Sequence, residues 1–383
     1  MKHFHKFTIL LLALFTSTTL FATDQVVINN SDSGAGSLRQ AIVDAVDGDE
    51  ITFTLASGTE TITILSELAI AESLTINGSN SAGSGVEVTV QVTAPGTSTF
   101  RVFNIDASEK TVAISNMTIK GGDVSSFEGI SMFGGSILIN TGTLNLDNVI
   151  VSESKAHGGG GILINEDAIC SIEGCTISHC TATDVSGSGG GGILCVETIS
   201  SINNTSISYN STSTTGEGYG GGIYLYYGGT LTSLTNSTIN NNTAVMGGGL
   251  LSGSATIGSI INCTVSNNIA SNMMGGIYLN ASTLNNMNFC TVSNNSATNY
   301  PDYDIGLLAY NSTVTIQNSI LANNNNFDYY FVSEDGRAGS LTDNGNNIVG
   351  ISNVAANATG GFNHATSILY NTKHDDPSTT ETS

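Results

Sequence analysis

Four polar residues form the group in this chain of 383 residues that is best suited to chemistry. Glu153, Lys155 and His157 lie at alternate positions of one short segment, and His179 follows further along the chain. Alternate residues of a strand point the same way, so neighbouring turns of a repeating fold could gather the four side chains on one flank. Together they could transfer protons or hold a metal ion. A solvated flank is the interpretation that the sequence favours.

Calcium is the one metal for which the sequence offers oxygen ligands. Asp302, Asp304 and Asp328 could lie between neighbouring turns, although they lack the spacing of an EF-hand loop. No pair of Cys and His residues has the spacing of a zinc site. We therefore predict no metal site and no cofactor, and leave calcium binding near these three aspartates open.

All of these residues lie within a repeated pattern of short apolar segments. Runs of glycine are followed by an Ile or Leu at intervals of 25 to 31 residues. A second series keeps step with the first, and consists of Ile119, Ile150, Ile177, Ile207, Ile239, Val265, Val292 and Ile320. Each repeat therefore carries two short segments with the alternation of β-strands. We predict an all-β, right-handed parallel β-helix of about ten turns, with like strands stacked ~4.8 Å apart.

Asparagine and cysteine also recur at fixed places in the repeat. Three residues after the second series come Asn210, Asn242, Asn268, Asn295 and Asn323. Stacked amides can hydrogen-bond from turn to turn, so we predict a structural role for them. Cys175, Cys263 and Cys290 lie two residues before the same series, which predicts buried thiols. A disulfide between Cys263 and Cys290 in adjacent turns is also geometrically possible.

The chain divides into four parts on these patterns. Residues 1–22 have the basic start, apolar run and small residue of a signal peptide. Residues 23–116 form an N-terminal cap and the first irregular turns, with a helical plug in which Leu38, Ala41, Ile42 and Ala45 share one face. Residues 117–350 carry the regular turns, and 351–383 a partly disordered tail. The loops before the glycine runs, 121–133, 183–190 and 211–220, should emerge on one flank and are the usual place for function in a solenoid.

The charge composition of the chain restricts the classes of partner that it can bind. The chain has 9 Lys and Arg against 31 Asp and Glu, a formal net charge of −22. This charge argues against nucleic acid and anionic membranes as partners. The mature chain offers no apolar segment long enough to cross a membrane, so we expect an extracellular or cell-surface location after cleavage of the signal peptide.

A row of large apolar side chains is the strongest sequence signal for binding. The position after each leading Ile or Leu is occupied by Leu138, Leu163, Leu194, Tyr224, Leu251, Tyr278 and Leu308. Strand alternation places these seven residues outside the core, where they would form an exposed stripe for a partner or for stacking on glycans. The alternative is that the glycine-rich loops fold over them, or that a bend turns them inward.

Three motifs together resemble a known class of proteins. They are the segment 32–42 (Asp-Ser-Gly-Ala-Gly-Ser-Leu-Arg-Gln-Ala-Ile), the glycine-led strands, and the pair of segments 318–323 and 345–350. The chain resembles bacterial surface proteins with a right-handed parallel β-helix, a pectin-lyase-like solenoid. It is similar to polymorphic outer-membrane proteins and to choice-of-anchor β-helix proteins. The resemblance implies a place outside the cell or at the outer membrane, often with an adhesive role.

Enzymes of the same fold class are the alternative function. A lyase acting on uronates needs cations, but Lys155 is the only Lys or Arg between Gly121 and Tyr330. A hydrolase needs two converging acids, and the acids of the regular turns are sparse. We therefore predict an exported, non-catalytic, adhesin-like passenger that binds a host-cell, matrix or glycan surface. A polysaccharide lyase or glycoside hydrolase is the alternative.

Overall fold

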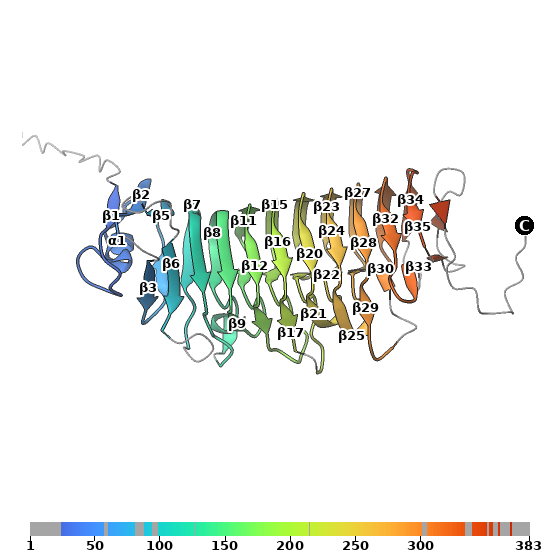
Figure 1. Ribbon diagram of the computed structural model, residues 1–383, viewed down its shortest axis with the longest axis horizontal. Coiled ribbons are helices and arrows are strands. Elements are labelled where there is room, and N and C mark those ends of the chain that lie inside the picture. Colours follow the sequence, from blue (N-terminus) through green and yellow to red (C-terminus); the bar gives the residue numbers. More distant parts are fainter. Residues whose placement is uncertain are drawn as a thin grey trace, which may run out of the picture.

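The protein is a long stack of parallel strands (Figure 1). The computed structural model describes residues 24–56, 60–80, 88–93, 99–126, 128–213, 215–300, 305–333 and 339–350, and three short strands at 352–354, 359–360 and 368–369. These strands build about 11 turns of a parallel β-helix, which confirms the predicted fold class. The expected signal peptide at 1–22 and the end of the tail at 371–383 lie outside the described residues.

The N-terminal turns are less regular than those that follow. Two long strands, β7 and β8, each supply all three strands of one turn: successive parts of β7 pair with β4, β5 and β6, and successive parts of β8 pair with the first strands of the three regular series. The strands of this part are β1 (Gln25–Val27), β2 (Asp49–Phe53), β3 (Thr61–Ile64), β4 (Leu68–Ile70), β5 (Leu74–Asn80), β6 (Val88–Val92), β7 (Phe103–Lys120) and β8 (Ile137–Ser152).

Each regular turn has three strands in the long sheet, not the two that the sequence predicted. The series after the glycine runs is β10 (Ile162–Ile164), β14 (Ile193–Cys195), β18 (Ile223–Leu225), β22 (Leu250–Gly253), β26 (Ile277–Asn280), β30 (Ile305–Tyr310), β33 (Phe327–Val332) and β36 (Ser352–Val354). The second is β11 (Ala168–Glu173), β15 (Thr198–Asn203), β19 (Thr230–Thr235), β23 (Thr256–Ile261), β27 (Thr283–Asn288), β31 (Thr313–Gln317), β34 (Ser340–Asp343) and β37 (Thr359–Gly360). The third is β12 (Thr176–Ser178), β16 (Ser206–Ser208), β20 (Thr238–Asn240), β24 (Thr264–Ser266), β28 (Thr291–Ser293), β32 (Ile320–Ala322), β35 (Ile348–Val349) and β38 (Ile368–Leu369).

A fourth, shorter set of strands forms a separate six-stranded sheet. It comprises β9 (Lys155–Ala156), β13 (Thr181–Ala182), β17 (Ser211–Thr212), β21 (Thr243–Met246), β25 (Ile269–Met273) and β29 (Ser296–Ala297). The sequence analysis missed both this set and the series from β11 to β37. The second series that it predicted, from Ile119 to Ile320, corresponds to the third series of the structure. In β15 the buried residues Ile199 and Ile202 are three positions apart, because the pairing of β11 with β15 contains an irregularity. Such a bulge breaks the alternation by which a strand is recognised.

One continuous core runs along the axis of the solenoid, from Val27 to Val349. The leading residues Ile162, Ile193 and Ile223 stack in register, as the repeat predicts. The second predicted series is wrong at two positions: Ile150 is 37% and Ile320 40% exposed. Val151 and Leu321 take the buried places. A slip of one residue exchanges the two faces of a strand, and in both strands the neighbouring residue is equally apolar.

The asparagine ladder is confirmed for four of its five predicted members. Asn242 donates through its backbone N and its Nδ2 to Oδ1 of Asn268, both at 3.0 Å. Asn268 Nδ2 in turn donates to the Ile239 carbonyl at 2.9 Å. The same bonds link Asn210, Asn242, Asn268, Asn295 and Asn324. The predicted Asn323 is wrong by one residue, as a consequence of the slip in β32.

The predicted N-terminal plug is present as α1 (Leu38–Asp44). Ser37 Oγ accepts a hydrogen bond from Gln40 N at 3.2 Å, which caps the first turn. Leu38, Ala41 and Ile42 are buried against the end of the core. A short 3-10 helix, η1 (Gly129–Met132), is the other helix in the described residues. Among all the residues that the structure describes, no helix is long and apolar enough to cross a lipid bilayer.

Pairing of strands continues beyond residue 350, where the sequence placed the start of the tail. β36, β37 and β38 pair in parallel with β33, β34 and β35, so a further turn lies within residues expected to be tail.

All six cysteines are buried and none forms a disulfide. The possible bond between Cys263 and Cys290 is therefore absent. Burial raises the pKa of the Cys180 and Cys195 thiols to about 12. The cysteines thus occupy the core as small apolar residues, as the repeat predicts.

Candidate functional site

Three of the four polar residues Glu153, Lys155, His157 and His179 contact side chains outside the group. Glu153 pairs with Lys120 at 2.8 Å, and the Lys155 ammonium lies 3.8 Å from Asp123. The ring of His179 stacks on Tyr209 with centroids 5.3 Å apart. Glu153, Lys155 and His179 thus each have a partner outside the group. Within the described residues no cluster of three His, Cys, Asp or Glu side chains could hold a metal ion.

The structure describes only one of the three aspartates considered for calcium binding. Asp302 and Asp304 lie outside the described residues. Asp328 is buried and accepts hydrogen bonds from Asn324 N at 2.8 Å and from Asn324 Nδ2 at 2.9 Å. Asp328 therefore closes the asparagine ladder at its C-terminal end.

The predicted apolar stripe lies outside the core, but the expectation that it is exposed is wrong. Leu163, Leu194 and Tyr224 are 1 to 4% exposed, and Leu251 and Leu308 are also buried. Leu138, Leu163, Leu194, Tyr224 and Leu251 form a second apolar cluster, separate from the main core, against which Tyr278 packs. Leu308 belongs to a third cluster with Met274 and Ile305.

Glycine-rich backbone covers the stripe, which was the alternative left open by the sequence. Gly220 and Gly247 have φ of +61° and +66°, a left-handed conformation that turns the chain back over the strand that follows. A Cβ atom on Gly220 would lie 2.9 Å from Tyr224 Cβ, and one on Gly247 2.8 Å from Leu251 Cβ. Only glycine lets the backbone approach the buried side chains so closely.

A groove of about 490 Å³ remains open above part of this cluster. The three loops that the sequence singled out supply walls: Ile130 and Phe133 from the first, Ser186 to Ser188 from the second, Glu217 and Tyr219 from the third. We call it the tyrosine groove. Its lining residues are Ile130, Phe133, Leu163, Asn165, Glu166, Ser186, Gly187, Ser188, Leu194, Val196, Glu217, Tyr219, Tyr224, Tyr226 and Tyr227.

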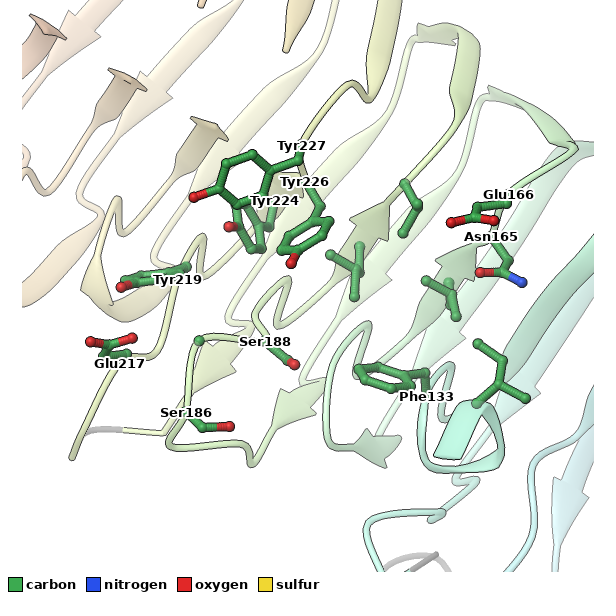
Figure 2. A pocket seen from close by; sticks show the side chains of 15 residues that line it. Phe133, Asn165, Glu166, Ser186, Ser188, Glu217, Tyr219, Tyr224, Tyr226 and Tyr227 are labelled. Atoms are coloured by element: carbon green, nitrogen blue, oxygen red, sulfur yellow. The ribbon is translucent and has the colours of Figure 1, made fainter. Parts of the chain in front are cut away.

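Four tyrosines make an aromatic wall along the groove (Figure 2). Tyr219 and Tyr224 meet edge to face with centroids 5.7 Å apart, as do Tyr224 and Tyr226 at 5.6 Å. Tyr226 and Tyr227 meet at 4.9 Å, and these two side chains are 40% and 66% exposed. Edge-to-face contacts are the favoured geometry for rings, so the buried Tyr224 holds its exposed neighbours in place.

Two carboxylates lie at opposite ends of the groove. Figure 2 shows Glu217 beside Tyr219 at one end and Glu166 beside Asn165 at the other. Burial and a hydrogen bond to Glu217 raise the pKa of Tyr219 to about 12, so this phenol remains protonated. Glu166 and Glu217 lie in successive turns, 51 residues apart, and Ser186 from the turn of Glu166 pairs directly with Glu217. About 1.7 turns of the solenoid therefore separate the two acids by roughly 8 Å along the axis.

Asp184 fixes the loop at the centre of the groove. Its carboxylate accepts bonds from Ser186 N and Ser188 N, both at 3.0 Å, and from Ser186 Oγ at 2.8 Å. These hydrogen bonds lower the pKa of Asp184 to about 2 against the opposing effect of burial, which is the largest single influence. The groove is therefore shaped by a loop with its own internal polar contacts.

A second cavity of about 420 Å³ adjoins the first through the shared residue Ile130. Arg101 lies buried in its wall and donates to the carbonyls of Phe133 at 2.6 Å and Ser131 at 2.7 Å. Its Nε donates to Glu67 at 3.2 Å. Since the guanidinium is occupied in this way, Arg101 anchors the loop that carries η1 and Phe133.

Sequence reasoning pointed to the three loops and to part of the floor, but it did not predict that they enclose a groove. It named Leu163, Leu194 and Tyr224, which the structure places in the floor and wall, but not Phe133, Tyr219, Tyr226 or Tyr227. The aromatic run Tyr224-Leu225-Tyr226-Tyr227 was a signal that could have found them, because exposed aromatic residues in a loop are typical of binding sites.

Comparison with known proteins gives no relative: no protein-family model, no curated protein and no solved structure matches the chain.

Proposed function

We propose that this protein is an exported, non-catalytic β-helix that binds glycans at the tyrosine groove, at a cell or matrix surface. The observation that carries the proposal is the groove itself: exposed Tyr226 and Tyr227 beside amide, hydroxyl and carboxylate groups, over an apolar floor. Sugar rings have apolar faces that stack on aromatic side chains, and rims of hydroxyls that need hydrogen-bond partners. The groove offers both along two or more turns of the solenoid.

The length of the groove favours a chain of sugars over a single one. Asn165 and Glu217 lie at its two ends (Figure 2). Asn165, Val196 and Tyr226, which follow stacked strands of three successive turns, all line it. Each turn advances ~4.8 Å along the axis, about the length of one sugar unit in an extended chain. An oligosaccharide lying parallel to the axis would therefore touch Tyr226 and both ends together.

Hydrolysis is the competing function, since Glu166 and Glu217 are two acids in one groove. Retaining hydrolases need carboxyl groups about 5 Å apart, and inverting ones need at most about 9.5 Å. A separation of roughly 8 Å along the axis exceeds the range of a retaining pair but not that of an inverting pair. The spacing therefore speaks against retaining hydrolysis, and the assay for reducing ends described below distinguishes inverting hydrolysis from binding alone.

The test is a glycan array probed with the wild-type chain and with the double variant Tyr226→Ala/Tyr227→Ala. Loss of two stacked rings at about 1 kcal/mol each should weaken binding about 30-fold. Tyr209→Ala is the matched control, because Tyr209 is a similarly exposed tyrosine that packs on His179 instead of lining the groove. Equal binding by the double variant would refute the proposal, and release of new reducing ends from a bound glycan would favour the enzyme.

A further inference from the structure

The charges around the tyrosine groove are all of one sign. Glu166 and Glu217 line it, and no Lys, Arg or His is among the lining residues in the described part of the chain. Neither glutamate takes part in an ion pair among the described residues. The nearest cation in the sequence, Lys155, faces Asp123.

This composition determines which glycans can be held there. A uronate or sulfated sugar would bring a negative charge between two carboxylates, without a cation to neutralise it. The overall charge of −22 opposes the approach of such a ligand as well. Anionic glycans are therefore disfavoured both in the groove and on the way to it.

The same charges favour the binding of a positively charged sugar. Aromatic ring faces attract cations through their quadrupoles, and the exposed fractions of Tyr226 and Tyr227, 40% and 66%, leave ring surface within reach of a ligand. Glu217 adds a carboxylate at one end and Glu166 at the other, roughly 8 Å apart along the axis. The spacing allows two amino groups of one chain to be bound at once.

We propose that the tyrosine groove selects oligosaccharides that carry protonated amino groups, with Glu217 and Glu166 as counter-charges at its two ends. This inference rests on the proposed glycan-binding function and narrows it to one chemical class. Glucosamine oligomers are the simplest representatives. N-acetylation would remove the charge and leave the sugar rings able to stack.

The experiment measures affinity by calorimetry at low salt for three hexamers: glucosamine, N-acetylglucosamine and galacturonate. We expect glucosamine to bind about tenfold more tightly than N-acetylglucosamine, galacturonate not to bind, and the preference to fall as salt screens the charges. Glu217→Gln should weaken glucosamine binding about fivefold and leave N-acetylglucosamine within twofold. Glu197→Gln is the control, because Glu197 is an exposed acid that lines a different cleft.

The outcomes separate the two proposals. Equal affinity for both glucosamine hexamers, unaffected by Glu217→Gln, refutes the preference for amines and leaves the glycan groove in place. Absence of binding to any glycan refutes the proposed function and this inference together. Equal binding of hexalysine, with the same dependence on Tyr226 and Tyr227, also overturns the inference, because any polycation would then suffice.

Discussion

Replacement of Asn268 by alanine is the sharpest test of what holds the turns together. The side chain is completely buried and makes four hydrogen bonds. Its Oδ1 accepts from Asn242 N and Nδ2 at 3.0 Å, and its Nδ2 donates to Ile239 O and Asn295 Oδ1 at 2.9 Å. At about 1 kcal/mol for each lost bond, Asn268→Ala should lower the free energy of unfolding by about 4 kcal/mol.

The measurement is urea unfolding followed by circular dichroism, with amide exchange at Asn242 as the local readout. Asn267→Gly is the matched control: Asn267 is exposed, has a φ of 56°, and should tolerate glycine within about 0.5 kcal/mol. Asn268→Leu distinguishes hydrogen bonding from volume, since leucine fills the space but leaves the same partners unpaired. Wild-type stability in the leucine variant, or a loss below about 1 kcal/mol in the alanine variant, would show that the ladder does not stabilise the fold as argued.

Three further predictions concern the thiols, the groove loop and the covered stripe. The unfolded chain should react with six equivalents of iodoacetamide without any reductant, because all six cysteines are free, and reaction only after reduction would contradict this. Asp184→Asn should remove about 1 kcal/mol of stability at pH 7, after allowance for solvent screening. The pKa of Asp184 is lowered to about 2 in the folded protein, from 3.8 in the unfolded chain. The stability advantage of the wild type over Asp184→Asn is therefore present above pH 3.8 and is lost as the pH falls towards 2. If the advantage persists at pH 2, Asp184 does not stabilise the loop as a carboxylate. Leu194→Ala should cost about 2 to 3 kcal/mol in a thermal melt, whereas a loss under about 0.5 kcal/mol would mean that the stripe is exposed after all.

The repeated pattern was enough to predict the fold because a parallel β-helix is built from local periodicity. Ile162, Ile193 and Ile223 stack because each follows a glycine run at nearly constant spacing, and Asn242 and Asn268 stack for the same reason. Where the pattern was ambiguous the prediction failed. Ile150 and Val151 are both apolar, and only pairing with Ile177 in the next turn decides which one is buried.

The groove depends on contacts that no local pattern contains. Whether Leu194 is exposed is decided by Gly158 and Phe133, both from earlier turns. A Cβ atom on Gly158 would lie 3.0 Å from Leu194 Cδ2, and Arg101 holds the carbonyl of Phe133. The sequence determined that Leu163, Leu194 and Tyr224 lie outside the core, since alternation along a strand fixes the side on which a residue stands. Only the tertiary structure decided that loops cover these residues and leave Tyr226 and Tyr227 exposed to solvent. The reason is that packing between turns about 30 residues apart sets the positions of the loops.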